Sequence, residues 1–216
     1  MLAIRELLQP NPDDLAIDLG CGSGVISAYL GSSGAQVIGV DESFDAISFA
    51  RDKFSSNRVS FQLHDIVTFE LIECKANKIF CLECIEHIPR YSAKTMLQKC
   101  AKYLAPDGHI FMTTPNYRSI WPMIEYVLDR TGLVPHMDGT QHVTHYNRDE
   151  ICRIADETGY EVVSMRSMCL ISPWLNLMSH HAAVRIHQWE IRRLNRWGPI
   201  LAFVLRPKWT HMAGGY

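Results

Sequence analysis

The sequence predicts an α/β fold in which helices cover a largely parallel sheet. Short apolar runs rich in β-branched residues alternate with stretches whose apolar residues recur at helical spacing, and turn residues separate them. This alternation is typical of consecutive βαβ units with right-handed crossovers. A chain of 216 residues corresponds to about one domain of ordinary size. We therefore expect residues 1–216 to form a single domain.

Five strand candidates lie in the first half of the chain and two more near its end. The first five are residues 15–19, 36–41, 58–63, 78–82 and 109–114, and the later two are 160–168 and 200–206. Helical patterns cover residues 25–30, 44–54, 92–104 and 146–157. Ser43 stands at an N-cap position, and residues 106–108 (Pro-Asp-Gly) predict a turn before the fifth strand.

Two segments interrupt the alternation, and we interpret them as substrate-side insertions. Residues 116–144 are rich in aromatic residues, Pro, Gly and His, and residues 173–197 form a helical stretch with tryptophans and arginines. Long connections in α/β proteins often carry the substrate site. In the second segment an apolar stripe predicts a core or dimer helix, with a helix touching a membrane or a lipid-like substrate as the alternative. The stripe consists of Leu175, Met178, Ala182, Ile186 and Trp189.

The composition argues against several classes of protein. The formal net charge is -2, so the basic footprint of a nucleic-acid-binding protein is absent. No apolar run approaches the roughly 20 residues of a transmembrane helix, and the N-terminus lacks a secretory-signal pattern. The 7 cysteines lie mostly inside apolar runs. This pattern indicates reduced thiols and a cytoplasmic location.

A glycine-rich segment, DLGCGSG at residues 18–24, follows the first strand and opens a helix. Its glycines remove side chains where a ligand must lie against backbone N–H groups. The second strand ends at Asp41, where a carboxylate would hold a ribose diol, and the third is followed by Asp65. A dinucleotide-dependent oxidoreductase shares this logic, although its expected spacing is Gly-x-Gly-x-x-Gly.

These segments resemble the motifs of class I S-adenosylmethionine-dependent methyltransferases. The glycine segment resembles the family's first motif, Asp41 its ribose-binding acid, and residues 104–109 its Leu-x-Pro-Gly-Gly turn. The resemblance implies S-adenosylmethionine as methyl donor. It also implies a Rossmann-like seven-stranded sheet of order 3-2-1-4-5-7-6, with strand 7 antiparallel and helices on both faces. The donor-binding residues that it implies are Asp18, Gly20, Cys21, Gly22, Gly24, Asp41, Glu42, His64, Asp65, Ile66 and Glu83.

An acidic segment with a histidine, residues 83–87 (Glu-Cys-Ile-Glu-His), follows the fourth strand. The carboxyl ends of parallel strands share one ligand edge, so this segment should lie near the reacting methyl group. Glu83 and Glu86 are three residues apart and would share a face of a helical turn. Carboxylates with an imidazole can ligate a divalent ion, or hold and deprotonate a substrate hydroxyl.

The pattern Glu-x-x-Glu-His resembles two methyltransferase subgroups. Residues 83–89 are similar to the ubiquinone-biosynthesis O-methyltransferases. The small-RNA 3′-end 2′-O-methyltransferases share the pattern, carry Thr-Pro-Asn-Tyr as at residues 114–117, and bind a metal through a later histidine that matches His142. The resemblance thus implies His87, His142 and Glu86 as catalytic residues, and Glu83, Glu86, His87 and His142 as candidate metal ligands.

The resemblance therefore implies O-methylation of a small-molecule hydroxyl by in-line methyl transfer. Two other functions stay open, a metal-dependent 2′-O-methyltransferase that acts on RNA and a protein that binds S-adenosylmethionine without catalysis. The acidic net charge of -2 disfavours nucleic acid as a partner. Dependence on a divalent metal ion and assembly into a homodimer also stay open.

Overall fold

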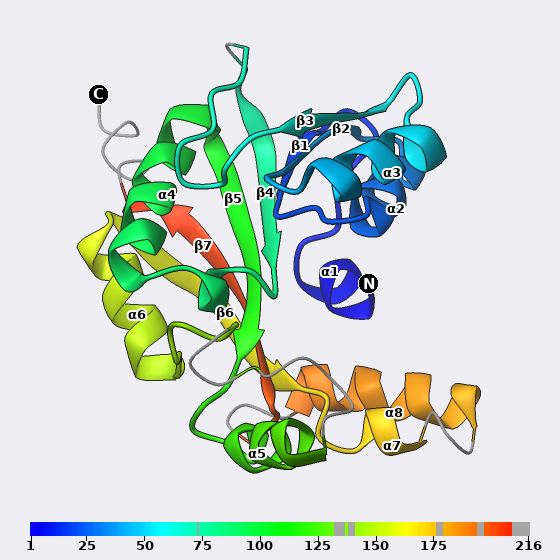
Figure 1. The fold of residues 1–216 in the computed structure, drawn as a ribbon, viewed down its shortest axis with the longest axis vertical. Coiled ribbons are helices and arrows are strands. Elements are labelled where there is room, and N and C mark those ends of the chain that lie inside the picture. Colours follow the sequence, from blue (N-terminus) through cyan, green and yellow to red (C-terminus); the bar gives the residue numbers. More distant parts are fainter. Residues whose placement is uncertain (73, 132–136, 138–140, 176–178, 194–196, 209–216) are drawn as a thin grey trace.

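The computed structural model describes residues 1–72, 74–131, 137, 141–175, 179–193 and 197–208. Its seven-stranded sheet has the order β3-β2-β1-β4-β5-β7-β6 (Figure 1). The strands are β1 (Leu15–Leu19), β2 (Gln36–Asp41), β3 (Val59–Leu63), β4 (Ala76–Leu82), β5 (Leu104–Pro115), β6 (Tyr160–Met168) and β7 (Ile200–Pro207). The first five pair in parallel, and β7 runs antiparallel to both neighbours. The predicted strand order and the antiparallel seventh strand are confirmed.

Helices cover both faces of the sheet, as predicted. They are α1 (Leu2–Leu7), α2 (Val25–Ser32), α3 (Phe44–Phe54), α4 (Arg90–Tyr103), α5 (Trp121–Thr131), α6 (Arg148–Glu157), α7 (Ser172–Leu175) and α8 (His180–Arg193), with a 3-10 turn η1 (Ile85–His87). Residues of α4 and α6 pack into one core, and residues of α1, α2, α3 and α8 pack into the other (Figure 1). None of the described helices is both long and apolar enough to span a membrane.

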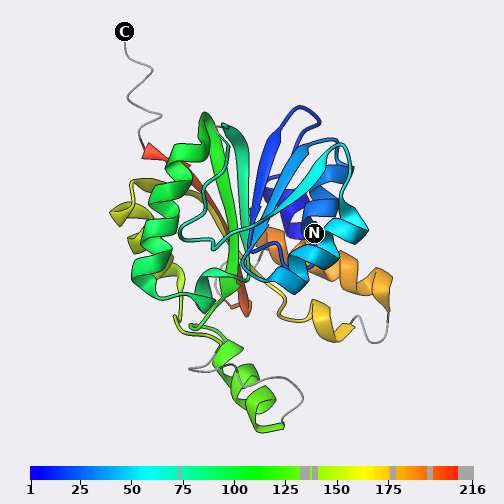
Figure 2. The ribbon, with the colours of Figure 1, turned by 45° about the horizontal axis from the view of Figure 1, so that its top comes forward.

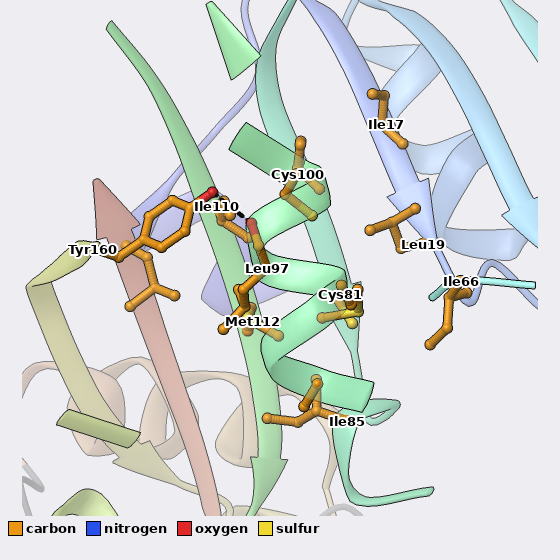
Figure 3. Packing of buried hydrophobic residues seen from close by; sticks show 14 of the residues in the cluster. Ile17, Leu19, Ile66, Cys81, Ile85, Leu97, Cys100, Ile110, Met112 and Tyr160 are labelled. Carbon is orange, nitrogen blue, oxygen red and sulfur yellow. Dashed lines mark hydrogen bonds between the residues drawn. The ribbon is translucent and has the colours of Figure 1, made fainter. Parts of the chain in front are cut away.

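The two cores are separated by the alternation of side chains along the central strands. Cys81 and Met112 belong to the core beneath α4 and α6, whereas their neighbours Phe80 and Phe111 belong to the other core. Tyr160 packs against the first core, and its hydroxyl donates a 2.9 Å hydrogen bond to the carbonyl oxygen of Leu97 in α4 (Figure 3). This bond satisfies a buried polar group inside an apolar layer.

Strand β5 begins earlier than the sequence predicts. Leu104 pairs with Ala76 and His109 pairs with Lys78, so the register shifts between these two positions. Residues 106–108, which were predicted as a turn, therefore lie inside an irregular strand. The turn prediction was wrong because pairing with β4 overrides the local turn preference and accommodates the extra residues as an irregularity.

The buried face of α8 differs from the predicted apolar stripe. Trp189 is 51% exposed, whereas Ala183, Glu190 and Ile191 are buried. The stripe residue Met178 lies outside the described residues. The buried face of α8 is therefore shifted, and it includes an acid that no hydrophobic pattern would place there.

The buried acid Glu190 explains this shift. Its carboxylate accepts hydrogen bonds from the backbone N–H groups of Cys169, Ile171 and Ser172 at 3.1, 2.6 and 3.2 Å. The Ser172 hydroxyl adds a further bond of 2.7 Å. A carboxylate that receives several N–H groups can be buried at low cost. Glu190 thereby attaches α8 to the chain that leaves β6.

Candidate active site

The glycine loop connects β1 to α2 and packs against the end of β2. The N–H groups of Gly20 and Cys21 donate to the carbonyl oxygen of Val40 at 2.8 and 3.0 Å. Gly24 caps α2 with a φ of 82°, and a Cβ at this position would lie 2.8 Å from the Cβ of Ala50. Both the left-handed backbone and the close approach require glycine at residue 24.

Asp41 joins this loop to the ends of β2 and β3. Its Oδ2 accepts a 2.8 Å hydrogen bond from the N–H of Gly22, and its Oδ1 accepts one of 2.9 Å from Ser43. The N–H of His64 donates to the Asp41 carbonyl oxygen at 3.0 Å. The structure thus brings together the segments that follow three parallel strands, as their shared carboxyl edge predicts.

Asp18 lies inside this loop rather than on its surface, with 2% of the residue exposed. Burial raises the pKa of Asp18 to about 6, a 2.6 Å hydrogen bond from the Ser27 hydroxyl opposes the shift, and the charge of Asp41 adds to it. Asp18 therefore holds the loop onto α2 through Ser27.

The remaining residues implied for the donor differ in exposure. Asp65 is exposed, and its Oδ1 accepts the N–H groups of Val67 and Thr68 at 2.6 and 3.0 Å, which caps the turn after β3. Cys21 and Ile66 are buried, and Glu42 is exposed. Cys21 and Ile66 can therefore offer mainly their backbone to a ligand.

The acid–histidine segment lies directly beside the glycine loop. Leu19 pairs with Cys81 across β1 and β4, and a Cβ on Gly20 would lie 2.5 Å from the Sγ of Cys84. Glu83 follows β4 with a φ of 47°, a left-handed conformation that is uncommon outside glycine and that clusters at functional sites. The chain therefore turns sharply between β4 and η1, next to the loop that the donor motif occupies.

Glu86, His87 and His142 come together at this turn, and their candidate ligand atoms all lie within 4.8 Å of one another. We call these three residues the acid–histidine group. Glu86 and His142 are buried and His87 is exposed. The N–H groups of Val143 and Thr144 donate to the Glu86 carbonyl oxygen at 2.8 and 3.0 Å. These bonds hold the later histidine against η1, whereas Glu83 lies outside the group.

Both histidines of the group are held through Nδ1. The Nδ1 atom of His87 is 2.8 Å from the carbonyl oxygen of Gln141. The Nδ1 atom of His142 is hydrogen-bonded to Glu125 Oε1 and lies 3.0 Å from the Tyr117 hydroxyl. With Nδ1 engaged, Nε2 is the nitrogen that each ring offers to a ligand. A histidine backed by a carboxylate is typical of metal sites and of general bases.

Sequence reasoning missed Glu125. It is the buried residue of α5, 3% exposed, whereas Met123 and Tyr126 on the same helix are exposed. Figure 2 shows α5 standing away from the sheet. The Tyr117 hydroxyl donates a 2.7 Å bond to Glu125 Oε1. An acid on a helix is ordinarily a surface residue, so only its contact with His142 identifies it.

The carboxyl groups of Glu83 and Glu86 influence each other. Desolvation raises the pKa of both above the usual range, and the charge of Glu86 adds to the shift of Glu83. Glu83 keeps contact with solvent, yet the protein atoms around its carboxyl disfavour the charged form. The hydroxyl of Thr114 opposes the shift of Glu86 through a 3.1 Å bond to Oε2. Two carboxyl groups with raised pKa values are stabilised when a proton or a bound cation neutralises their negative charge.

A family model described as a methyltransferase domain matches residues 3–165 of the chain. The chain belongs to the class I S-adenosylmethionine-dependent methyltransferases. The enzymes of this family use S-adenosylmethionine as their methyl donor.

Curated relatives of this methyltransferase carry the name ubiquinone biosynthesis O-methyltransferase. The protein of Idiomarina loihiensis is 32% identical over 162 residues, which cover 70% of this chain and 63% of the relative. The protein of Cupriavidus pinatubonensis is 29% identical over 160 residues, which cover 70% of this chain and 62% of the relative. The match thus spans less than two thirds of these relatives' length.

Solved methyltransferase structures share the fold. An S-adenosylmethionine-dependent methyltransferase from Mesorhizobium loti has a TM-score of 0.68 at 14% identity, covering 95% of both chains. The magnesium protoporphyrin IX methyltransferase of Synechocystis, solved with bound S-adenosylhomocysteine, has a TM-score of 0.61 at 19% identity and covers 94% of this chain and 78% of that protein. At these identities the likeness supports the architecture alone.

Proposed function

We propose that this methyltransferase transfers the donor methyl group to a hydroxyl oxygen of a small-molecule acceptor. The observation that carries the proposal is the acid–histidine group of Glu86, His87 and His142 beside the glycine loop. A hydroxyl is a weak nucleophile until its proton is removed, and this group contains the acceptors for that proton. The names of the curated relatives support oxygen as the methylated atom.

The donor would lie along the glycine loop. Its ribose hydroxyls would meet Asp41, whose carboxylate is already held in position by backbone N–H groups. Its adenine would lie near residues 64–66, and its methionine part near residues 18–24, as the family motifs imply. The full proposed set is Asp18, Gly20, Cys21, Gly22, Gly24, Asp41, Glu42, His64, Asp65, Ile66 and Glu83.

The chemical step is an in-line displacement. The acceptor oxygen attacks the sulfonium methyl carbon, the carbon–sulfur bond breaks, and S-adenosylhomocysteine leaves with the electron pair. The hydroxyl proton passes to Nε2 of His87 or His142. A neutral imidazole is a suitable acceptor for this proton. Glu125 stabilises the cationic ring of His142 if that ring takes the proton. The protein contributes mainly alignment and exclusion of water.

The donor set of the acid–histidine group also fits a divalent metal ion. A carboxylate and two imidazoles suit zinc and its transition-metal neighbours, and Glu86, His87 and His142 would hold the ion, with Glu125 supporting His142. Glu83 is a further proposed ligand, although it lies outside the group in the structure. A bound ion would lower the pKa of a coordinated acceptor hydroxyl.

Methyl transfer to catechol tests the proposal. The purified chain should convert S-adenosylmethionine to S-adenosylhomocysteine in the presence of catechol, with an O-methylated product identified by mass spectrometry. Glu86→Gln and His87→Asn should lower the rate by about 100-fold or more. His145→Asn is the matched control, because His145 stacks on Tyr117 outside the acid–histidine group. Full activity of His87→Asn and His142→Asn would refute the proposed role of the group.

Methylation of RNA is the second candidate function, since Glu86, His87 and His142 are grouped as a metal-dependent 2′-O-methyltransferase would need. A short RNA duplex supplied with labelled donor separates the two functions. Label in RNA but not in catechol, lost after chelation with EDTA and restored by Mn²⁺, would favour this second candidate.

A further inference from the structure

A cavity of about 350 Å³ opens between α1, α7 and α8. We infer that this cavity binds an uncharged apolar molecule through a hydroxyl group, which donates a hydrogen bond to Nε2 of His187. The volume lies within the roughly 300–1,000 Å³ of small-molecule sites. The described residues that line it, none of which belongs to the acid–histidine group or the proposed donor set, are Leu2, Cys169, Ser172, His180, Ala183, Val184 and His187.

The cavity is built where β6 ends. Strands β5 and β6 both run antiparallel to β7, so they point in the same direction and β6 ends at the edge where the parallel strands end. Cys169 therefore leaves the sheet at the same edge as Glu83, the edge at which α/β sheets bind ligands. Helices α7 and α8 lie side by side (Figure 1). An ion pair of 3.0 Å between Arg192 and Glu6 joins α8 to α1.

The hydrogen bonds around Ser172 determine the tautomer of His187. The Ser172 hydroxyl donates to Glu190 Oε2 at 2.7 Å, because an ionised carboxylate can only accept. Since a hydroxyl has one hydrogen, its oxygen must accept the 3.0 Å bond from Nδ1 of His187. The neutral ring thus carries its hydrogen on Nδ1, and Nε2 keeps a lone pair. Within the described part of the chain, Nε2 of His187 has no hydrogen-bond partner.

His187 and Cys169 are both uncharged at the cavity. Burial lowers the pKa of His187 and favours the neutral ring, although the charge of Glu190 opposes this shift. Burial raises the pKa of the Cys169 thiol to about 12, so the thiol keeps its proton and is a poor metal ligand. The carboxylate of Glu190 lies fully buried behind Ser172. This chemistry disfavours an ion and leaves one acceptor nitrogen for a hydroxyl group.

Cys169 adopts a left-handed backbone conformation with a φ of 68°. Its N–H donates to Glu190 Oε2 at 3.1 Å, which helps to maintain this conformation. Among the described residues, Glu83 is the only other non-glycine residue with a positive φ. Strained residues of this kind cluster at ligand sites. The apolar remainder of the described lining, which would contact the body of the ligand, includes Leu2, Ala183 and Val184.

NMR of the histidine side chains tests the inference without turnover. The full chain, isotope-labelled at its histidines and saturated with S-adenosylhomocysteine, is titrated with phenol, with cyclohexanol and with anisole, which has no hydroxyl hydrogen. Without these ligands, His187 should show the tautomer with its hydrogen on Nδ1. At least one alcohol should shift the Nε2 signal of His187 and bind about three- to tenfold more tightly than anisole, because a hydrogen bond is worth that much. The tighter alcohol identifies an aromatic or an aliphatic ligand.

Variants assign the effect to the cavity. His187→Leu should lower the affinity for the alcohol to that for anisole. His181→Leu, at an exposed histidine of α8 outside the described lining, should leave both affinities unchanged. Ser172→Ala should weaken binding of the alcohol severalfold but retain binding of anisole, because it releases the tautomer of His187. Val184→Ser should weaken all three ligands, since it removes apolar surface from the lining.

Three results would overturn the inference. They are a neutral His187 ring with its hydrogen on Nε2, equal affinity for both alcohols and anisole, and binding of a Zn²⁺ ion that requires both His187 and Cys169. The last result would assign the cavity to a metal ion. The tautomer and the titrations are measured on the unmodified chain, so they decide the question even where a variant fails to fold. No measurement uses methyl transfer, and failure of the proposed function would therefore leave this inference standing.

Discussion

Glu125 and His142 form a buried carboxylate–imidazole pair in which Glu125 Oε1 is hydrogen-bonded to Nδ1 of the histidine. The two residues come from different segments, since Glu125 lies on α5 and His142 precedes α6. Because Nδ1 of His142 is engaged by Glu125, Nε2 is the nitrogen left for a metal ion or a proton. Carboxylates that hydrogen-bond to metal-binding histidines orient the imidazole ring in the same way. The helix α5 is thereby coupled to the proposed reaction centre.

Replacing Glu125 with Gln should weaken binding of Zn²⁺ about 10- to 100-fold, because a neutral amide supports the orientation and basicity of His142 less well. Isothermal titration of the metal-free chain with Zn²⁺ measures this change. Tyr126→Phe, at an exposed neighbour on α5, should bind as the unmodified chain does. Unchanged affinity of Glu125→Gln would show that Glu125 serves only to attach α5.

Replacing Asp18 with Asn should increase stability at neutral pH. Burial raises the pKa of Asp18 from its usual 3.8 to about 6, so the folded chain retains this proton to higher pH than the unfolded chain. The contribution of the protonated Asp18 to the stability of the fold is fully present below pH 3.8 and is lost as the pH rises through about 6. The difference between the pKa values of 3.8 and about 6 sets an upper limit of about 3 kcal/mol for the gain in stability at pH 7.

Urea unfolding at pH 4 and pH 7 tests the Asp18 prediction. The stability difference between Asp18→Asn and the unmodified chain should be larger at pH 7, while Asp52→Asn, on an exposed side chain, should show no such difference. We also expect Asp18→Asn to bind S-adenosylhomocysteine more weakly, in keeping with its proposed place at the donor. A larger gain at pH 4 than at pH 7 would contradict the assigned cause.

Alanine at Gly24 should cost more stability than alanine at Gly159, although both glycines have a φ of 82°. A Cβ at Gly159 meets nothing within 4 Å, whereas one at Gly24 would lie 2.8 Å from Ala50 and Phe61 atoms. Gly159→Ala should therefore cost about 1–2 kcal/mol from backbone strain alone. Gly24→Ala should lose about 1–3 kcal/mol more from overpacking.

Chemical denaturation compares the two glycine variants, and titration with S-adenosylhomocysteine adds a functional measurement. Only Gly24→Ala should impair binding of this product, since Gly159 follows α6 and lies outside the donor motif. Equal stability losses in the two variants would show that α2 moves to admit the extra methyl group without cost.

Replacing Glu190 with Ala should destabilise the chain by about 3 kcal/mol or more, because buried N–H groups at the end of β6 lose their acceptor. Trp189→Ala, on the adjacent exposed residue, should change stability by about 0.5 kcal/mol or less. Thermal and urea unfolding of both variants measure the difference. Similar losses in the two would mean that water replaces the carboxylate.

Local sequence patterns were sufficient for most of the architecture. The strands, the helix start at Ser43 and the glycine loop depend on side-chain periodicity and turn chemistry within a few residues. The family motifs then supplied the strand order, which the structure confirms. The same parallel topology explains why the expected donor segments after β1, β2 and β3 meet at one edge.

The features that the sequence could not supply are polar contacts between distant segments. In the sequence, Glu125 and Glu190 resemble ordinary surface acids on helices. Only tertiary packing places Glu125 beside His142 and Glu190 beside backbone N–H groups, and these partners offset the cost of burying the two carboxylates. The irregular start of β5 likewise depends on its pairing with β4. By itself, the sequence determined the order of elements and the donor motifs, because these follow from local periodicity and spacing. The family resemblance had already implied Glu86, His87 and His142, and the tertiary structure decided that Glu83 lies outside their group and that Glu125 supports it. Burying a charge depends on partners that only the folded chain brings near.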